Sequence, residues 1–76
     1  MKEFLIYLIS KIIDFPGDLK IEETQSGDNF FQYMISANTS DIGKIIGKEG
    51  KIIQAIRNVA RILAVKENKQ IRIEIA

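Results

Sequence analysis

The sequence predicts a small α+β domain in which a three-stranded sheet packs against three helices, in the order α-β-β-α-α-β. Three observations support this fold class. Apolar residues recur with a helical period at the N-terminus, they alternate with polar residues after Pro16-Gly17, and two further helical patterns flank residues 47–50. Because a chain of 76 residues can bury only one small core, we expect residues 1–76 to form a single domain.

The first helix is expected in the apolar segment at the N-terminus. The apolar residues at helical spacing are Leu5, Leu8, Ile9, Ile12 and Ile13. Pro16-Gly17 ends this pattern. Phe4, Ile6 and Tyr7 fall partly outside the stripe. They indicate either a small core that surrounds the helix on several sides or a second chain that covers it.

A β-hairpin is expected after the first helix. Leu19, Ile21 and Glu23 share one side of its first strand, and residues 26–29 (Ser-Gly-Asp-Asn) have the composition of a turn. In the second strand of the hairpin, apolar and polar residues alternate, and the residues expected to face inward are Phe31, Tyr33, Ile35 and Ala37. The last strand alternates in the same way, with Ile71, Ile73 and Ile75 facing inward. Asn68 precedes the last strand and adopts a left-handed backbone at low cost.

Two helices are expected between the second and third strands. Residues 38–40 (Asn-Thr-Ser) are good N-cap residues and Asp41 adds negative charge to the first turn, so one helix is expected to run to about Ile46 and to end at Gly47. A longer helix is expected from Gly50. Its predicted inner face consists of Ile52, Ile53, Ile56, Val59, Ala60 and Leu63.

The composition excludes most kinds of catalytic site. The chain has no cysteine and no histidine, so thiol nucleophiles, thiolate metal sites and the usual general base are absent. No pair of carboxylates is placed for acid–base chemistry, and we expect neither an enzyme nor a cofactor, metal or small-molecule substrate. The apolar run at the N-terminus is shorter than the ~20 residues of a membrane span and has no cleavage site, so a cytoplasmic location is expected.

Three glycines interrupt an otherwise apolar segment: Gly43, Gly47 and Gly50. Each costs a helix about 1 kcal/mol relative to alanine, which indicates that the segment needs bare backbone. Gly47 and Gly50 bracket a two-residue loop at the N-terminus of the long helix, where unpaired N–H groups and the helix dipole favour an anion. Lys44, Lys48 and Lys51 surround the loop with positive charge. The spacing fits neither a nucleotide P-loop nor a dinucleotide fingerprint.

The segment 45–53, IIGKEGKII, resembles the GXXG loop of KH domains and its flanking helices. The order α-β-β-α-α-β is similar to that of type II KH domains. Residues 41–50 (Asp-x-Gly-Lys-x-Ile-Gly-Lys-x-Gly) followed by Ala-Ile-Arg at 55–57 resemble the small stand-alone bacterial KH proteins of the KhpA type. This resemblance covers essentially the whole chain, although its specific motifs are confined to residues 41–57.

The resemblance implies a single type II-like KH domain that binds single-stranded RNA, as an RNA chaperone or post-transcriptional regulator. In this family the GXXG loop, here residues 47–50, holds the sugar-phosphate backbone while an adjacent groove receives about four nucleotides. The RNA-binding residues that the resemblance implies are Gly43, Lys44, Ile46, Gly47, Lys48, Glu49, Gly50, Lys51, Ile53 and Arg57. Because Glu49 would repel phosphate and the net charge is only +1, we expect modest, weakly sequence-specific affinity.

A protein-interaction subunit is the alternative function, with RNA binding weak or secondary. The resemblance implies a homodimer or a heterodimer with a larger KH-domain protein, and the surplus apolar residues at Phe4, Ile6, Tyr7 and Ile62 fit such a contact. Arg61 is expected to face solvent or a partner, and Ile52 is expected to belong to the core.

Overall fold

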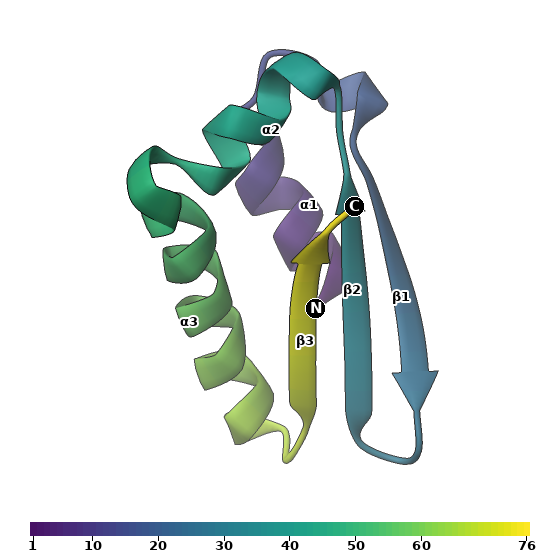
Figure 1. Ribbon diagram of the computed structural model, residues 1–76. Coiled ribbons are helices and arrows are strands. Elements are labelled where there is room, and N and C mark those ends of the chain that lie inside the picture. The colour runs from purple at the N-terminus through teal and green to yellow at the C-terminus, as the bar shows by residue number, and fades with distance from the viewer.

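The computed structural model describes residues 1–76 and has the predicted order of elements (Figure 1). The helices and strands are α1 (Lys2–Ser10), β1 (Lys20–Ser26), β2 (Phe30–Ser36), α2 (Thr39–Ile46), α3 (Lys51–Lys66) and β3 (Gln70–Ile75). Two short 3-10 turns, η1 (Pro16–Asp18) and η2 (Lys48–Gly50), precede β1 and α3. None of the helices combines the length and apolar character that crossing a bilayer requires.

The sheet has the order β1-β2-β3, with β2 in the centre. β1 and β2 form the predicted antiparallel hairpin, in which Gly27 takes a positive φ of 76° in the turn. β3 lies parallel to β2, and the connection between them passes through α2 and α3. Asn68 has a φ of 57° just before β3, which confirms the expected left-handed residue. β3 is therefore an edge strand, and its free edge lies on the side away from β2.

The core lies between the sheet and the helices. Its buried apolar residues come from α1, the strands, α2, α3 and the linker after α1: Leu5, Ile9, Ile13, Ile21, Tyr33, Ile35, Ile45, Ile53, Ile56, Ala60 and Ile73. Tyr33 donates a hydrogen bond of 2.7 Å from its hydroxyl to Glu23. Burial, with this hydrogen bond as the next cause, raises the pKa of Tyr33, so its hydroxyl stays protonated as a donor. The expectation that Phe31 and Tyr33 face the core is confirmed.

The predicted inner face of α3 is too wide. Ile52, Val59 and Leu63 keep 39%, 44% and 37% of their surface exposed, whereas Ala64, which was not expected in the core, is buried. The reason is geometric, because β3 and α2 pack against α3 and the buried residues of α3 recur at intervals of three and four along a single stripe. The remaining apolar residues form a second stripe beside the core, on the surface of the molecule.

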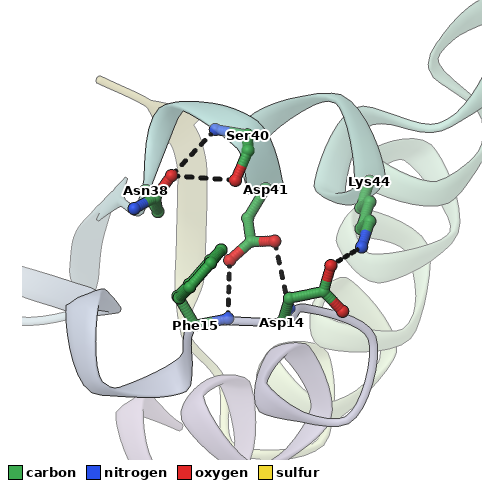
Figure 2. A network of polar contacts seen from close by, with 6 residues as sticks. All are labelled: Asp14, Phe15, Asn38, Ser40, Asp41 and Lys44. Atoms are coloured by element: carbon green, nitrogen blue, oxygen red, sulfur yellow. Dashed lines mark hydrogen bonds and ion pairs between the residues drawn. The ribbon is translucent and has the colours of Figure 1, made fainter.

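Asp41 is a buried carboxylate that attaches the linker after α1 to the first turn of α2 (Figure 2). Its two oxygens accept hydrogen bonds of 3.0 and 2.9 Å from the backbone N–H groups of Asp14 and Phe15. One turn further along α2, Lys44 forms an ion pair with the Asp14 side chain. Of the three candidate N-cap residues at 38–40, Asn38 caps the helix, since its side chain accepts from the N–H of Ser40 at 3.0 Å. These contacts fix where α2 begins relative to α1.

Replacing Asp41 is expected to destabilise the fold. In Asp41→Ala, two backbone N–H groups lose their acceptor, which should lower the free energy of unfolding by roughly 2–3 kcal/mol. Urea denaturation followed by circular dichroism measures this change. Asp14→Ala is the control, since it removes only the exposed ion pair with Lys44 and should cost less than about 1 kcal/mol. Equal losses in the two variants would contradict the assignment.

Candidate nucleic-acid interface

The loop between α2 and α3 needs glycine at position 47 for two independent reasons. Gly47 has φ 75° and ψ 175°, a combination that is essentially restricted to glycine. A Cβ atom on Gly47 would also lie 2.5 Å from Cγ1 of Ile52, which packs over this glycine from the first turn of α3. This contact is the role of Ile52, which was expected in the core but is partly exposed.

Glu49 and Gly50 complete the turn with left-handed backbone conformations. Glu49 has φ 58° and ψ 26°, and Gly50 has φ 74° and ψ 15°. Nothing lies within 4 Å of a Cβ atom placed on Gly50, so glycine is favoured at this position only by the backbone conformation. Glu49 adopts the same region at a cost that glycine would avoid, and its exposed side chain forms no ion pair.

Gly43 lies in the body of α2 and has no packing reason to be glycine. Nothing lies within 4 Å of a Cβ built there, and its φ is not positive. Glycine at this position is therefore not required by the packing of α2 against any other element. The residue leaves an open, side-chain-free patch of surface one helical turn before Gly47.

A groove of about 280 Å³ runs between α3 and the free edge of β3. It is lined by Arg57 and Arg61 from α3 and by residues 71–74 from β3. Arg57 donates a hydrogen bond of 3.1 Å from Nε to the backbone carbonyl of Ile73. Arg72 pairs with Glu74, whereas Arg57 and Arg61 form no ion pair, so the groove has a net positive charge.

The groove and the glycine loop lie on the same side of α3. Arg57 follows Gly50 by seven residues and Arg61 follows Arg57 by four, spacings that return to nearly the same side of a helix with 3.6 residues per turn. Ile46, at the end of α2, is 37% exposed, whereas Ile53 is 6% exposed and belongs to the core. Ile46 is therefore the more accessible of the two isoleucines predicted to contact RNA, and neither of them lines the groove beside β3.

The three lysines predicted around the loop have different surroundings. Lys44 is paired with Asp14 beside the linker after α1 (Figure 2). Lys51 borders an apolar depression between α1 and α3, away from Arg57. Lys48 is exposed within the loop and has no ionic partner. Of the three amines, that of Lys48 is the one that lies within the loop and takes part in no ion pair.

Sequence reasoning missed part of the groove. Arg61 is exposed, as expected, and lines the groove together with Ile71 and Arg72, whose place in it was not predicted. The spacing of four residues between Arg57 and Arg61 was the available signal for a shared side of α3. The contribution of β3 had no such signal, since it depends on where the strand lies beside α3.

On the opposite side of α3 lies an apolar depression of about 330 Å³, which we call the α1–α3 face. It is lined by Leu8, Ile12, Lys51, Ile52, Ala55, Ile56 and Val59. Ile62, also on α3, and Tyr7, on α1, are 62% and 64% exposed. No group of three or more histidine, cysteine or acidic residues is placed to hold a metal ion.

Comparison with known proteins identifies relatives along nearly the whole chain. A family model described as KhpA/KhpB, KH domain, matches residues 2–75. Curated proteins named RNA-binding protein KhpA align over 75 residues, which are 99% of this chain. The one from Chlamydia pneumoniae is 44% identical, with 95% of its own length covered. Those from Clostridium perfringens and Listeria monocytogenes are 36% and 33% identical, with 99% and 97% covered. No solved structure matches the chain.

Alanine substitutions should separate the roles of the three glycines. Gly47→Ala is expected to lower the free energy of unfolding by about 3 kcal/mol or more, because backbone strain adds to the clash with Ile52. Gly50→Ala should cost about 1–2 kcal/mol from strain alone. Gly43→Ala should raise the stability by roughly 0.5–1 kcal/mol, since alanine favours a helix. Chemical denaturation of the three variants measures this order, and a Gly43→Ala loss as large as that of Gly47→Ala would contradict it.

Proposed function

The chain belongs to the KhpA/KhpB family of KH domains, and we propose that it binds single-stranded RNA. The observation that carries this proposal is the placement of the glycine loop and the arginine-lined groove on one side of α3. A single strand following that side would meet the loop with its phosphates and the groove with its bases. A duplex would not fit, since its bases are stacked and paired.

The loop supplies the groups that a phosphate needs. No side chain caps the N-terminus of α3, and no acidic residue occurs in its first turn, so the positive end of the helix is available to an anion. Gly47 and Gly50 add no Cβ atoms between the backbone and the phosphate, and Lys48 adds a charge. Glu49 opposes this attraction, and we expect affinities on the order of micromolar.

We keep the predicted contact residues as the proposed RNA site: Gly43, Lys44, Ile46, Gly47, Lys48, Glu49, Gly50, Lys51, Ile53 and Arg57. Arg61 joins this set because it lines the same groove as Arg57. The open surface at Gly43 suits a close approach of the RNA backbone. Lys44 would first have to leave Asp14, so we expect it to contribute less than Lys48.

In the cell we propose a role as an RNA chaperone or post-transcriptional regulator in the cytoplasm, exercised by one KH domain over residues 1–76. Each of the relatives described above is named an RNA-binding protein, and none is named as an enzyme. Weak, charge-based binding would let such a protein sample many transcripts.

The α1–α3 face favours a second function, as a surface for another protein chain. We propose that it mediates a homodimer or a heterodimer with a larger KH-domain protein, as the joint family name KhpA/KhpB suggests. Six of the seven residues that line the depression are apolar, and Ile62 on α3 and Tyr7 on α1 are further exposed apolar side chains. This face and the arginine groove lie on different sides of α3, so both contacts could be made at once.

The proposed function predicts that the chain binds a short single-stranded RNA more tightly than a duplex of matched length. Binding should weaken as salt is raised, because phosphate contacts release counterions. In the double variant Lys48→Asp/Glu49→Asp, RNA affinity should fall by at least about tenfold, while stability changes by no more than about 0.5 kcal/mol. Fluorescence anisotropy with labelled RNA measures the affinity, and circular dichroism checks the fold.

The chain offers a matched control for the loop variant. Lys2-Glu3 is a second exposed Lys-Glu pair, at the start of α1, so Lys2→Asp/Glu3→Asp makes the same change of charge away from the loop. This control should bind RNA nearly as well as the parent. If the parent bound a single strand and a duplex with equal affinity, binding of unpaired bases in the groove would be ruled out. If both double variants lost the same RNA affinity, the loss would reflect the change in net charge and not a contact of the loop with RNA.

The α1–α3 face predicts association in the absence of RNA. Sedimentation equilibrium at micromolar concentration should give a mass above the 8.6 kDa of one chain. Val59→Asp should return the protein to the monomer, because it places a charge on the apolar face. Phe15→Asp is the control, since Phe15 is 50% exposed but lies outside this face. If the parent stayed monomeric at high concentration, the α1–α3 face would not mediate a homodimer.

A further inference from the structure

Lys44 lies in the last turn of α2, and its amine is already bound by a carboxylate of the same chain. The partner is the side chain of Asp14, in the linker after α1 (Figure 2). Gly47, the first residue of the glycine loop, follows Lys44 by three positions, and residues at this spacing are neighbours on the surface of a helix. The ion pair therefore lies beside the loop to which we assign the RNA phosphates.

The carboxylate of Asp14 is kept near Lys44 by contacts of the backbone. The N–H groups of Asp14 and Phe15 donate hydrogen bonds of 3.0 and 2.9 Å to the two oxygens of Asp41, which is fully buried. Asp41 belongs to the first turn of α2, three residues before Lys44. The helix that carries the lysine thus also holds the linker that carries its partner. Binding of RNA at the surface would leave these buried hydrogen bonds intact.

The ion pair itself is exposed and can be exchanged. The side chains of Lys44 and Asp14 keep 45% and 66% of their surface exposed. Exposed pairs of this kind are favoured over the separated charges by no more than roughly fivefold. A phosphate group offers the amine the same combination of negative charge and acceptor oxygens. The amine can therefore pass from the carboxylate to a phosphate, and the loss of the internal ion pair reduces the affinity that is gained.

The other cations of the proposed RNA site have no such internal partner. Lys48, Lys51, Arg57 and Arg61 form no ion pair. Lys44 is therefore the one charge of the site that is neutralised by the chain itself. In the free protein it attracts an RNA backbone less than its formal charge would suggest.

We propose that Asp14 competes with RNA for Lys44 and so limits the affinity of the site. Its carboxylate occupies the amine in the free protein, and a phosphate displaces it in the complex. The inference rests on the proposed RNA binding and adds a residue that regulates its strength without touching the RNA. When the charge of residue 14 is removed, Lys44 should be free to bind a phosphate from the start. The affinity should then rise by about twofold to fivefold.

The test compares Asp14→Asn with a matched control in the same connection between α1 and β1. Asp18→Asn makes the same change of charge at an exposed residue of η1 that forms no ion pair. Fluorescence anisotropy with a labelled oligouridine should show the twofold to fivefold gain in Asp14→Asn and less than about a twofold change in Asp18→Asn. One additional phosphate contact should also steepen the plot of log affinity against log salt by about 0.7.

A second pair of measurements separates release of the lysine from a general loss of repulsion. In the Lys44→Met background, Asp14→Asn should change the affinity no more than Asp18→Asn does in the parent, because no amine remains to be released. In the parent, the carboxyl carbon resonance of Asp14 should move when oligouridine is added, since the ammonium group leaves it. The corresponding resonance of Asp18 should keep its position. Circular dichroism checks that each variant is folded.

Three results would overturn the inference. They are an affinity of Asp14→Asn that does not exceed that of the parent, an equal gain in Asp18→Asn, and a gain that persists in full in the Lys44→Met background. An Asp14 resonance that does not respond to RNA would also contradict the exchange. If the parent and Asp14→Asn both bound no RNA, the proposed function itself would be overturned, and the inference with it.

Discussion

The backbone conformation of Gly47 is the constraint on which the rest of the structure depends. With φ 75° and ψ 175° the chain leaves α2 and turns into α3 within a few residues, and Ile52 then occupies the space that a side chain at position 47 would need. This sharp turn lets α3 run back beside the sheet, so that β3 can pair with β2 in parallel (Figure 1). It also places the glycine loop at the start of the helix that forms one wall of the groove.

Helix α3 has three sides with different tasks. One side supplies Ile53, Ile56 and Ala60 to the core, and the sides next to it carry the arginines and the exposed apolar residues respectively. The division follows from helical periodicity, because residues that repeat every three or four positions share a side. The charge of the groove and the apolar character of the α1–α3 face can therefore coexist on sixteen residues without mixing.

The local features of the fold could be predicted from the sequence. The N-cap within residues 38–40, the end of α2 at Gly47 and the left-handed Asn68 each depend on the local preference of a residue, and each is where it was expected. The breadth of the core and the polar contacts could not be predicted. Asp41 was expected to act on the helix dipole, yet it binds the backbone of residues 14 and 15. A hydrogen bond between residues so far apart in the chain cannot be predicted until the packing of the elements is known.

The topology of the sheet determines when the groove can exist during protein synthesis. The β1–β2 hairpin is local and can form early, whereas the pairing of β3 with β2 must wait for the whole connection through α2 and α3. One wall of the groove is β3, which leaves the ribosome after the other two strands of the sheet. A nascent chain can thus display its glycine loop before it has a groove, because the groove is complete only after residues 70–75 have emerged.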